Sequence, residues 1–294
     1  MGQADERQIR SGHLSIRRLP PPSRRIIIRQ MMVPTAPVLY EKPPLIEALI
    51  GVAFLRPAED WDSIFFGKIH AELQDRFPIV ETIRGASIDL SRQGLALQAA
   101  PEVKRFKSLD GGIVVTVGPE NVGVSYLPPL LQGPYPGWAR LLDTTVSVLQ
   151  AYNSVVPVVA ARQIGVRYIN VLPFDPKSFQ LDSVLSQLPK LIPPAVFKER
   201  HPFNVRLERV ISSSSATLHR ETITLAAQAI QQGGGQLVLD VDESAYPGTN
   251  PSAAKFEIRD VSEMLHEQIR RRFDELVLKT VRDSFGRYSA PSIS

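Results

Sequence analysis

The stretch ARQIGVRYIN, residues 161–170, predicts a β-strand, because its side chains separate into two faces when they point alternately up and down. One face carries Arg162, Ile164, Val166, Tyr168 and Asn170, and the other carries Gln163, Gly165, Arg167 and Ile169. Arg167 thus shares its face with an apolar residue and needs a partner, because an unpaired buried charge is costly.

Glu47 is the predicted partner of this arginine. It lies in LIEALIGVAF, residues 45–54, where it shares a face with the apolar Leu45 and Leu49. A Glu47–Arg167 or Glu47–Arg162 ion pair would set the strand register at the point where two halves of the chain meet. Under this interpretation the 161–170 stretch is structural.

A binding groove is the alternative interpretation of the same residues. The forked donors of arginine suit an anionic group. The predicted lining is Arg162, Arg167, Tyr168 and Asn170, with Tyr135 and Trp138 as an aromatic wall. A tryptophan on the apolar stripe of a helix is more often a core residue, so both interpretations stay open.

Upstream of this strand, strand patterns and helix patterns follow one another. The predicted elements are a strand at 45–54, a helix at 61–77, strands at 79–90, 94–100 and 111–127, and a helix at 135–155. Asp62 suits the positive N-terminal end of the first helix, and Pro78 ends it. Gly118–Asn121 is a turn signal, so residues 111–127 predict a hairpin.

Downstream, the same order of patterns returns. The predicted elements are a strand at 162–174, a helix at 179–192, strands at 203–214, 216–230 and 236–246, and a long helix at 260–285. Gly233–Gly235 predicts a tight turn between the last two strands. The repeated order, with almost no identity between the halves, indicates an internal duplication.

These patterns predict an α+β fold of two duplicated units, each running strand, helix, antiparallel strands, helix. Long helices would cover one face of each sheet, as in the saddle of the TATA-binding protein or in helix-grip folds. The predicted organisation is a leader at 1–35, a first half at 36–160 and a second half at 161–294, packed as one body. Function does not follow from such a fold analogy.

Charge and composition exclude several kinds of chemistry. The chain has no cysteine, which removes disulfides, thiolate nucleophiles and cysteine metal sites. It has no apolar run near 18 residues, so we expect no membrane span. Residues 1–35 carry a net charge of +5, and the remaining residues carry −1. We expect the leader to be disordered or to precede the natural start, although a basic arm is also a feature of nucleic-acid binding.

Local motifs for catalysis and metal binding are weak. His266-Glu267 lacks the second histidine of a zinc helix, and we expect His266 to lie at the surface. Ser212–Ser215 and His219 lack the surroundings of a serine nucleophile. Asp240 and Asp242 are weak candidates for Mg²⁺, because alternate strand residues share a face. No cofactor and no catalytic residue is predicted.

Four stretches taken together carry a family resemblance. They are PPLIEALIGVAF (43–54), YPGW (135–138), ARQIGVRYIN (161–170) and HEQIRRRFDELV (266–277). In this order they resemble a sporadically distributed bacterial protein family of unknown function. The resemblance covers roughly residues 40–285, and implies a bacterial, cytoplasmic protein. It implies no activity and no site residues, and a patchy distribution is typical of laterally exchanged modules.

The leading functional hypothesis is a non-enzymatic binding or interaction module with a protein partner, in a laterally exchanged defence or toxin-linked operon. The first alternative is a small-ligand-binding protein or enzyme that uses a groove between the sheet and the long helices, with Arg167 and Asp240 as anchors. The second is nucleic-acid binding through the basic arm, against which the body's net charge of −1 speaks. A homo-oligomer is left open.

Overall fold

The structure of the protein is a computed structural model. It describes residues 39–40, 42–55, 61–83, 86–91, 94–99, 102–128, 137–156, 160–174, 183–186, 203–213, 217–229, 235–247 and 257–288. These residues belong to one compact unit, Val38–Ser294. The predicted leader, residues 1–35, lies outside the described residues.

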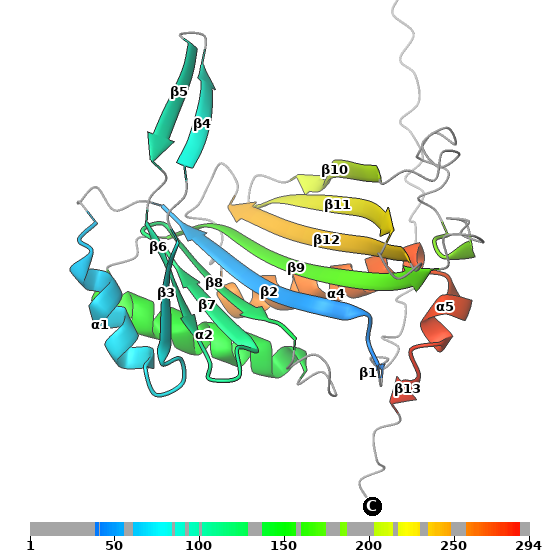
Figure 1. The fold of residues 1–294 in the computed structure, drawn as a ribbon, viewed down its shortest axis with the longest axis horizontal. Coiled ribbons are helices and arrows are strands. Elements are labelled where there is room, and N and C mark those ends of the chain that lie inside the picture. Colours follow the sequence, from blue (N-terminus) through cyan, green and yellow to red (C-terminus); the bar gives the residue numbers. More distant parts are fainter. Residues whose placement is uncertain are drawn as a thin grey trace, which may run out of the picture. The chain divides into compact units, whose positions relative to one another are not determined.

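One antiparallel sheet of nine strands organises the described part of the chain (Figure 1). Its strands are, from edge to edge, β10 (Phe203–Ser213), β11 (Thr217–Ala229), β12 (Gly235–Pro247), β9 (Ala161–Phe174), β2 (Leu45–Phe54), β8 (Asn121–Tyr126), β7 (Ile113–Val117), β6 (Val103–Lys107) and β3 (Ile79–Ile83). The central strand, β2, pairs with β8 on one side and with β9 on the other. Main-chain hydrogen bonds therefore join the two halves of the chain.

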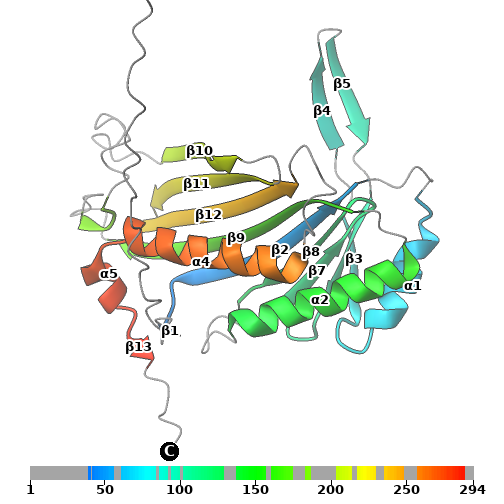
Figure 2. The ribbon, with the colours of Figure 1, turned by 180° about the vertical axis from the view of Figure 1, so that it is seen from behind.

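Two helices, α2 (Trp138–Val155) and α4 (Ile258–Leu276), lie against one face of this sheet (Figure 2). α1 (Ile64–Leu73) packs on α2, and α5 (Lys279–Asp283) follows α4. We call this side the helix face. The opposite side, which carries Leu49, Gly51 and Ala53 of β2, has no described helix on it, and we call it the open face.

The predicted fold class is wrong. We expected two duplicated strand–helix units, each with a sheet covered by long helices. The structure shows one nine-stranded antiparallel sheet, and its described residues contain only four helices. The pairing of β2 with β9 is the physical reason, because a free strand edge readily pairs with another strand. The edges at the boundary between the halves pair with each other, so a single sheet results.

The core lies between the sheet and the helices. Ala48, Ile50 and Val52 of β2 and Ile164 and Val166 of β9 are at most 1% exposed. The two faces predicted for the 161–170 stretch are thus confirmed. Burial of these apolar side chains is the main favourable contribution to the stability of such a two-layer packing.

The predicted shared face of Leu45, Glu47 and Leu49 is only partly correct. A register shift between Leu45 and Glu47 brings Leu45 opposite Asn170 and Glu47 opposite Ile169. Such a bulge adds one residue to a strand and turns the next side chain to the other face. Leu45 is therefore buried, whereas Glu47 lies on the open face with Leu49.

Two predicted elements are borne out with shifted bounds. The helix expected at 61–77 is α1, and the Ile64 N–H donates to the Asp62 carboxylate at 2.9 Å near its start. The hairpin expected at 111–127 is β7–β8, where the Gly118 N–H donates to the Asn121 carbonyl at 2.8 Å.

The prediction of one continuous helix at 260–285 is wrong. The helix α4 ends at Leu276, and a second helix, α5, begins at Lys279. Val277 has extended backbone between them. Most of the helix expected at 179–192 lies outside the described residues, and so does the Gly-rich turn before Gly235.

Two small antiparallel pairs complete the described elements. β4 (Ala86–Ser91) and β5 (Gly94–Ala99) form a separate hairpin, and β1 (Leu39–Tyr40) pairs with β13 (Arg287–Tyr288). Among the described helices, none has both the length and the apolar character needed to cross a membrane.

Candidate functional site

Three glycines lie side by side at the centre of the sheet. In the strand register, Gly51 of β2 is opposite Gly123 of β8 and opposite Gly165 of β9. The row continues to Ser244 of β12 on one side and to Thr116 of β7 on the other. The middle of the open face is therefore a strip of main chain without side chains.

Neither backbone conformation nor packing accounts for glycine at the centre of this row. Among the described residues, only Gly111, Gly137 and Gly286 have the positive φ that favours glycine. A Cβ built on Gly51 would have no atom within 4 Å. Glycine inside a strand is unfavourable, and it often marks a place where another molecule approaches the main chain.

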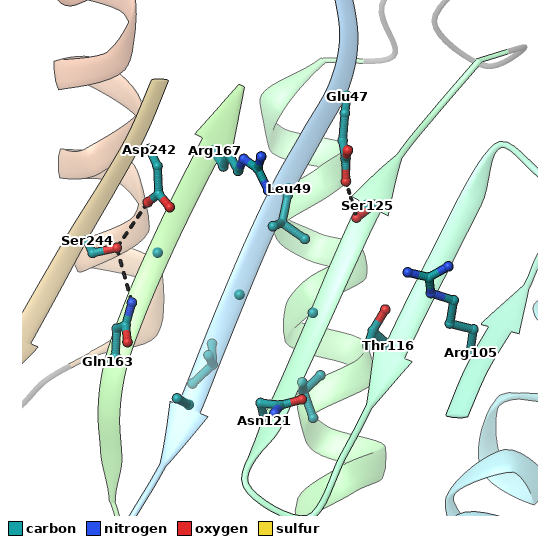
Figure 3. A pocket seen from close by; sticks show the side chains of 16 residues that line it. Glu47, Leu49, Arg105, Thr116, Asn121, Ser125, Gln163, Arg167, Asp242 and Ser244 are labelled. Atoms are coloured by element: carbon teal, nitrogen blue, oxygen red, sulfur yellow. Dashed lines mark hydrogen bonds between the residues drawn. The ribbon is translucent and has the colours of Figure 1, made fainter. Parts of the chain in front are cut away.

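The glycine strip is the floor of a hollow of about 370 Å³ on the open face (Figure 3). This volume lies in the range of small-molecule sites. Polar side chains of β12, β9 and β2 form one wall, and side chains of β8, β7 and β6 form the other. Among its lining residues, the ones with hydrogen-bonding or charged side chains are Glu47, Arg105, Asn121, Gln163, Arg167 and Asp242, with Thr116, Ser125 and Ser244.

On the first wall, Arg167 is bound by a carboxylate of the neighbouring strand. Its Nε and Nη2 donate to the two Asp240 oxygens at 2.9 and 2.7 Å. This bidentate geometry is the strong form of an ion pair. Asp240 also raises the pKa of the guanidinium, so Arg167 stays charged.

Asp242 is directly opposite Arg167 and forms a separate hydrogen-bonded chain. The Gln163 amide donates to the Ser244 hydroxyl at 3.2 Å, and that hydroxyl donates to Asp242 at 3.0 Å. Burial raises the pKa of Asp242, against the opposing effects of Ser244 and Arg167. The Asp242 carboxyl group therefore takes part in hydrogen bonds of the hollow. Burial disfavours its charged form, and a further cationic partner would stabilise that form.

On the same wall, Glu47 of β2 accepts a hydrogen bond from the hydroxyl of Ser125, on β8, at 2.9 Å. The predicted Glu47–Arg167 and Glu47–Arg162 pairs are wrong, since Arg167 binds Asp240 and Arg162 lies 3.7 Å from Glu120. Sequence alone does not show that β12 lies beside β9, which is why the closer carboxylate was missed. Glu47 and Arg167 nevertheless line the same hollow.

The predicted groove is divided by the sheet. Arg167 is on the open face, whereas Tyr168 and Asn170 are buried on the helix face. Arg162 is exposed beside Glu120 and does not line the hollow, and Tyr135 lies outside the described residues. Neighbours along a strand point to opposite faces, so these side chains cannot share one lining.

Tyr168 and Trp138 both contact His266, which lies on the side of α4 that faces the sheet. The Tyr168 hydroxyl lies 2.7 Å from His266 Nδ1, and the Trp138 ring stacks on the imidazole at 4.2 Å. The expected surface position of His266 is therefore wrong, since the residue is 8% exposed. Burial, aided by Arg270, lowers its pKa to about 3, and the imidazole is neutral at pH 7.

The weak prediction of a metal site is not supported by the described residues. Asp240 is engaged by Arg167 and Asp242 by Ser244. Within the described ranges, no group of three or more histidine, aspartate or glutamate side chains has the arrangement of a metal site.

A buried charged cluster on the helix face was missed by the sequence analysis. Glu221 of β11 and Glu243 of β12 are opposite each other in register, and each is at most 2% exposed. Arg209 and Arg272 bind Glu221, and His219 Nε2 lies 2.7 Å from Glu243. Burial raises the pKa of Glu243 to about 7. One signal was present in the sequence: both glutamates alternate in phase with inward apolar residues such as Ile223 and Val241.

No family model matches the chain, and a comparison with the curated proteins finds no match. Function is therefore inferred from the hollow and its residues.

Proposed function

We propose that the protein is a non-enzymatic binding module whose ligand occupies the hollow over the glycine row. The observation that carries the proposal is Gly51, a glycine in the central strand with open space where its side chain would be. Its neighbours in register, Gly123 and Gly165, extend the bare main chain over three strands. A ligand in contact with this floor gives Gly51 a reason that packing does not supply.

The lining supports binding rather than catalysis. The two serines of the hollow, Ser125 and Ser244, donate to carboxylates at 2.9 and 3.0 Å. A serine nucleophile is normally activated by an imidazole or an amine. Neither histidine nor lysine is among the residues that line the hollow.

The position of the hollow also separates this proposal from the two alternatives. A groove between the sheet and the helices has little support, because the helix face is filled by buried side chains such as Ile50, Val166 and Leu239. Nucleic acid has little support on the open face, where Glu47, Asp240 and Asp242 would repel phosphates.

A ligand screen with a blocked floor tests the proposal. The Gly51→Leu variant would fill the hollow from the centre of its floor. Gly67→Leu is the matched control, because Gly67 lies exposed on α1 and its Cβ would also have no atom within 4 Å. Both proteins and the wild type are screened by thermal shift against amino acids, short peptides, sugars, nucleosides and organic acids.

We expect at least one compound class to raise the melting temperature of the wild type and of Gly67→Leu, but not that of Gly51→Leu. Bound ligand stabilises a folded protein by mass action, so the shift should grow with ligand concentration. Compounds that stabilise all three proteins equally would contradict the proposal, and so would a screen without any stabilising compound.

A further inference from the structure

The first wall of the hollow has more carboxylates than cations. Glu47 and Asp242, which line the hollow, and Asp240 beside them lie near Arg167, whose Nε and Nη2 both donate to Asp240. A second arginine, Arg206 of β10, also lowers the pKa of Asp242, but it forms an ion pair with Glu208 at 2.7 Å. Asp242 and Glu47 are hydrogen-bonded to serines. Neither forms an ion pair within the described part of the chain. A ligand that places a cation against this wall would gain a charge-assisted hydrogen bond.

The opposite wall has a cation available for a ligand. Arg105 of β6 is opposite Glu81 in register, but Glu81 is bound by Lys107 at 2.6 Å. The Arg105 side chain extends over β7 toward β8 and the hollow (Figure 3). No described carboxylate forms an ion pair with it. The hollow thus has one negative wall and one positive wall.

The floor between these walls suits a flat chain with polar groups of its own. Gly165, Gly51 and Gly123 leave the main chain bare, so a ligand can lie close to it. Gln163 on β9 and Asn121 on β8 are both opposite Ala53, so they lie in one row on the same side of the strip, and each amide offers both a donor and an acceptor. Peptide groups have the same two functions, which makes an extended peptide complementary to this strip.

The width of the sheet sets the length of such a ligand. Asp242 on β12 and Arg105 on β6 are separated by five strand steps, which is about 24 Å at the usual strand spacing. The two side chains together reach across roughly a third of this distance. About 15 Å remains, and an extended chain of about four residues spans it at roughly 3.3 Å per residue.

From this arrangement we infer that the ligand is a short zwitterionic peptide, or a molecule built like one. Its ammonium end binds at Asp242 and its carboxylate end at Arg105, with its extended backbone over the glycine row. This inference rests on the proposed function and names the ligand class for the same hollow.

Isothermal titration with unblocked tetra-alanine tests the ligand class. N-acetylated tetra-alanine lacks the cation, and the C-terminal amide lacks the anion. Each blocked peptide should bind at least tenfold more weakly than the unblocked one, because a charged group of the protein loses its partner. Dialanine is too short to reach both walls and should also bind at least tenfold more weakly.

Two substitutions test the ends separately. In Asp242→Asn, N-acetylation should no longer weaken binding, while amidation still does. In Arg105→Gln, amidation should no longer weaken binding, while N-acetylation still does. Arg271→Gln is the control for Arg105, since Arg271 is exposed on α4 and does not line the hollow. Its affinities should match those of the wild type.

The ligand screen and the peptide titration, each repeated with Gly51→Leu, distinguish failure of the peptide inference from failure of the proposed function. If the hollow binds another class in the ligand screen and tetra-alanine does not bind, the peptide inference is wrong and the proposed function stands. Equal binding of blocked and unblocked peptides would overturn the inference as well. Tight binding of tetra-alanine that Gly51→Leu leaves intact would contradict both proposals.

Discussion

At the scale of single residues, Glu243 makes the stability of the fold depend on pH. Burial raises its pKa from 4.5 to about 7, with Glu221 adding to the rise and His219 opposing it. Between these values the folded protein binds more protons than the unfolded chain, so stability falls as pH rises through this window. Arg209 and Arg272, which bind the adjoining Glu221, are the other charged groups of the cluster.

The prediction for this residue uses Glu243→Gln, which stays uncharged and keeps a side-chain carbonyl oxygen to accept from His219. We expect the free energy of unfolding of the wild type, relative to that of the variant, to decrease between pH 5 and pH 7.5. Urea unfolding at pH 5, 6, 7 and 8 measures it. His266, whose pKa is lowered, gives a slope of opposite sign but contributes to both proteins and cancels in the difference. A difference that stays constant with pH would contradict the assignment.

At Gly51, a substitution should weaken ligand binding without lowering the stability of the fold. An alanine there has room for its Cβ, and alanine is better than glycine inside a strand by about 0.5–1 kcal/mol. Gly51→Ala should therefore unfold at the same or a higher urea concentration than the wild type, and bind its ligand more weakly. Gly67→Ala, in α1, should gain stability without losing binding. Destabilisation by Gly51→Ala would show that packing does require glycine.

The sequence predicts the face of a residue better than its partner. Alternation correctly assigns Ile164, Val166 and Tyr168 to the buried side of β9. The Arg167–Asp240 pair joins residues 73 positions apart, so it depends on the order of the strands, which alternation does not contain. The glycine row is hidden for the same reason, because each glycine is unremarkable until the register sets the three side by side.

At the scale of elements, α4 packs one side against the sheet and exposes its other side. Leu265 faces the core and is fully buried, whereas its neighbour Met264 is 40% exposed. Leu265→Ala should lower the free energy of unfolding by about 2–5 kcal/mol, because it loses apolar burial and leaves a cavity. Met264→Ala is the matched control and should change it by less than about 0.5 kcal/mol. Similar losses in both variants would mean that α4 is packed differently.

Most strands and helices follow from local patterns, with errors where tertiary contacts decide. The patterns locate α1, α2 and the β7–β8 hairpin. The apolar stripe of 260–285 has no sequence break, yet Val277 pairs with Leu185 from a distant segment and is extended there. That contact ends α4, and the periodicity of the helix does not reveal it.

At the scale of the whole described unit, the β2–β9 pairing makes both halves of the chain part of one sheet. Strands that share a sheet and a core are expected to unfold together. Val166→Ala, a fully buried position on β9, should therefore lower the protection of amides in β7–β8 as much as in β11–β12. Native-state hydrogen exchange in low denaturant measures both sets. A loss confined to β11–β12 would contradict a single cooperative sheet.

The predicted fold class is wrong for a reason that belongs to this same scale. The repeated order of patterns predicts two units, but whether two sheets stay apart depends on the pairing of their edge strands. The open face is a further consequence of the whole sheet, because it becomes visible only when all nine strands are in order. The hollow is thus a property of the assembled sheet and not of any one motif.

The most direct test of the binding site is an NMR titration of protein labelled with ¹⁵N only at glycine. The titrant is the compound that raises the melting temperature most. We predict that the amide signals of Gly51, Gly123 and Gly165 shift together and saturably, while those of Gly67 and Gly111, which lie outside the hollow, stay in place. Saturable shifts that leave the three floor glycines unmoved would contradict a ligand site on the open face.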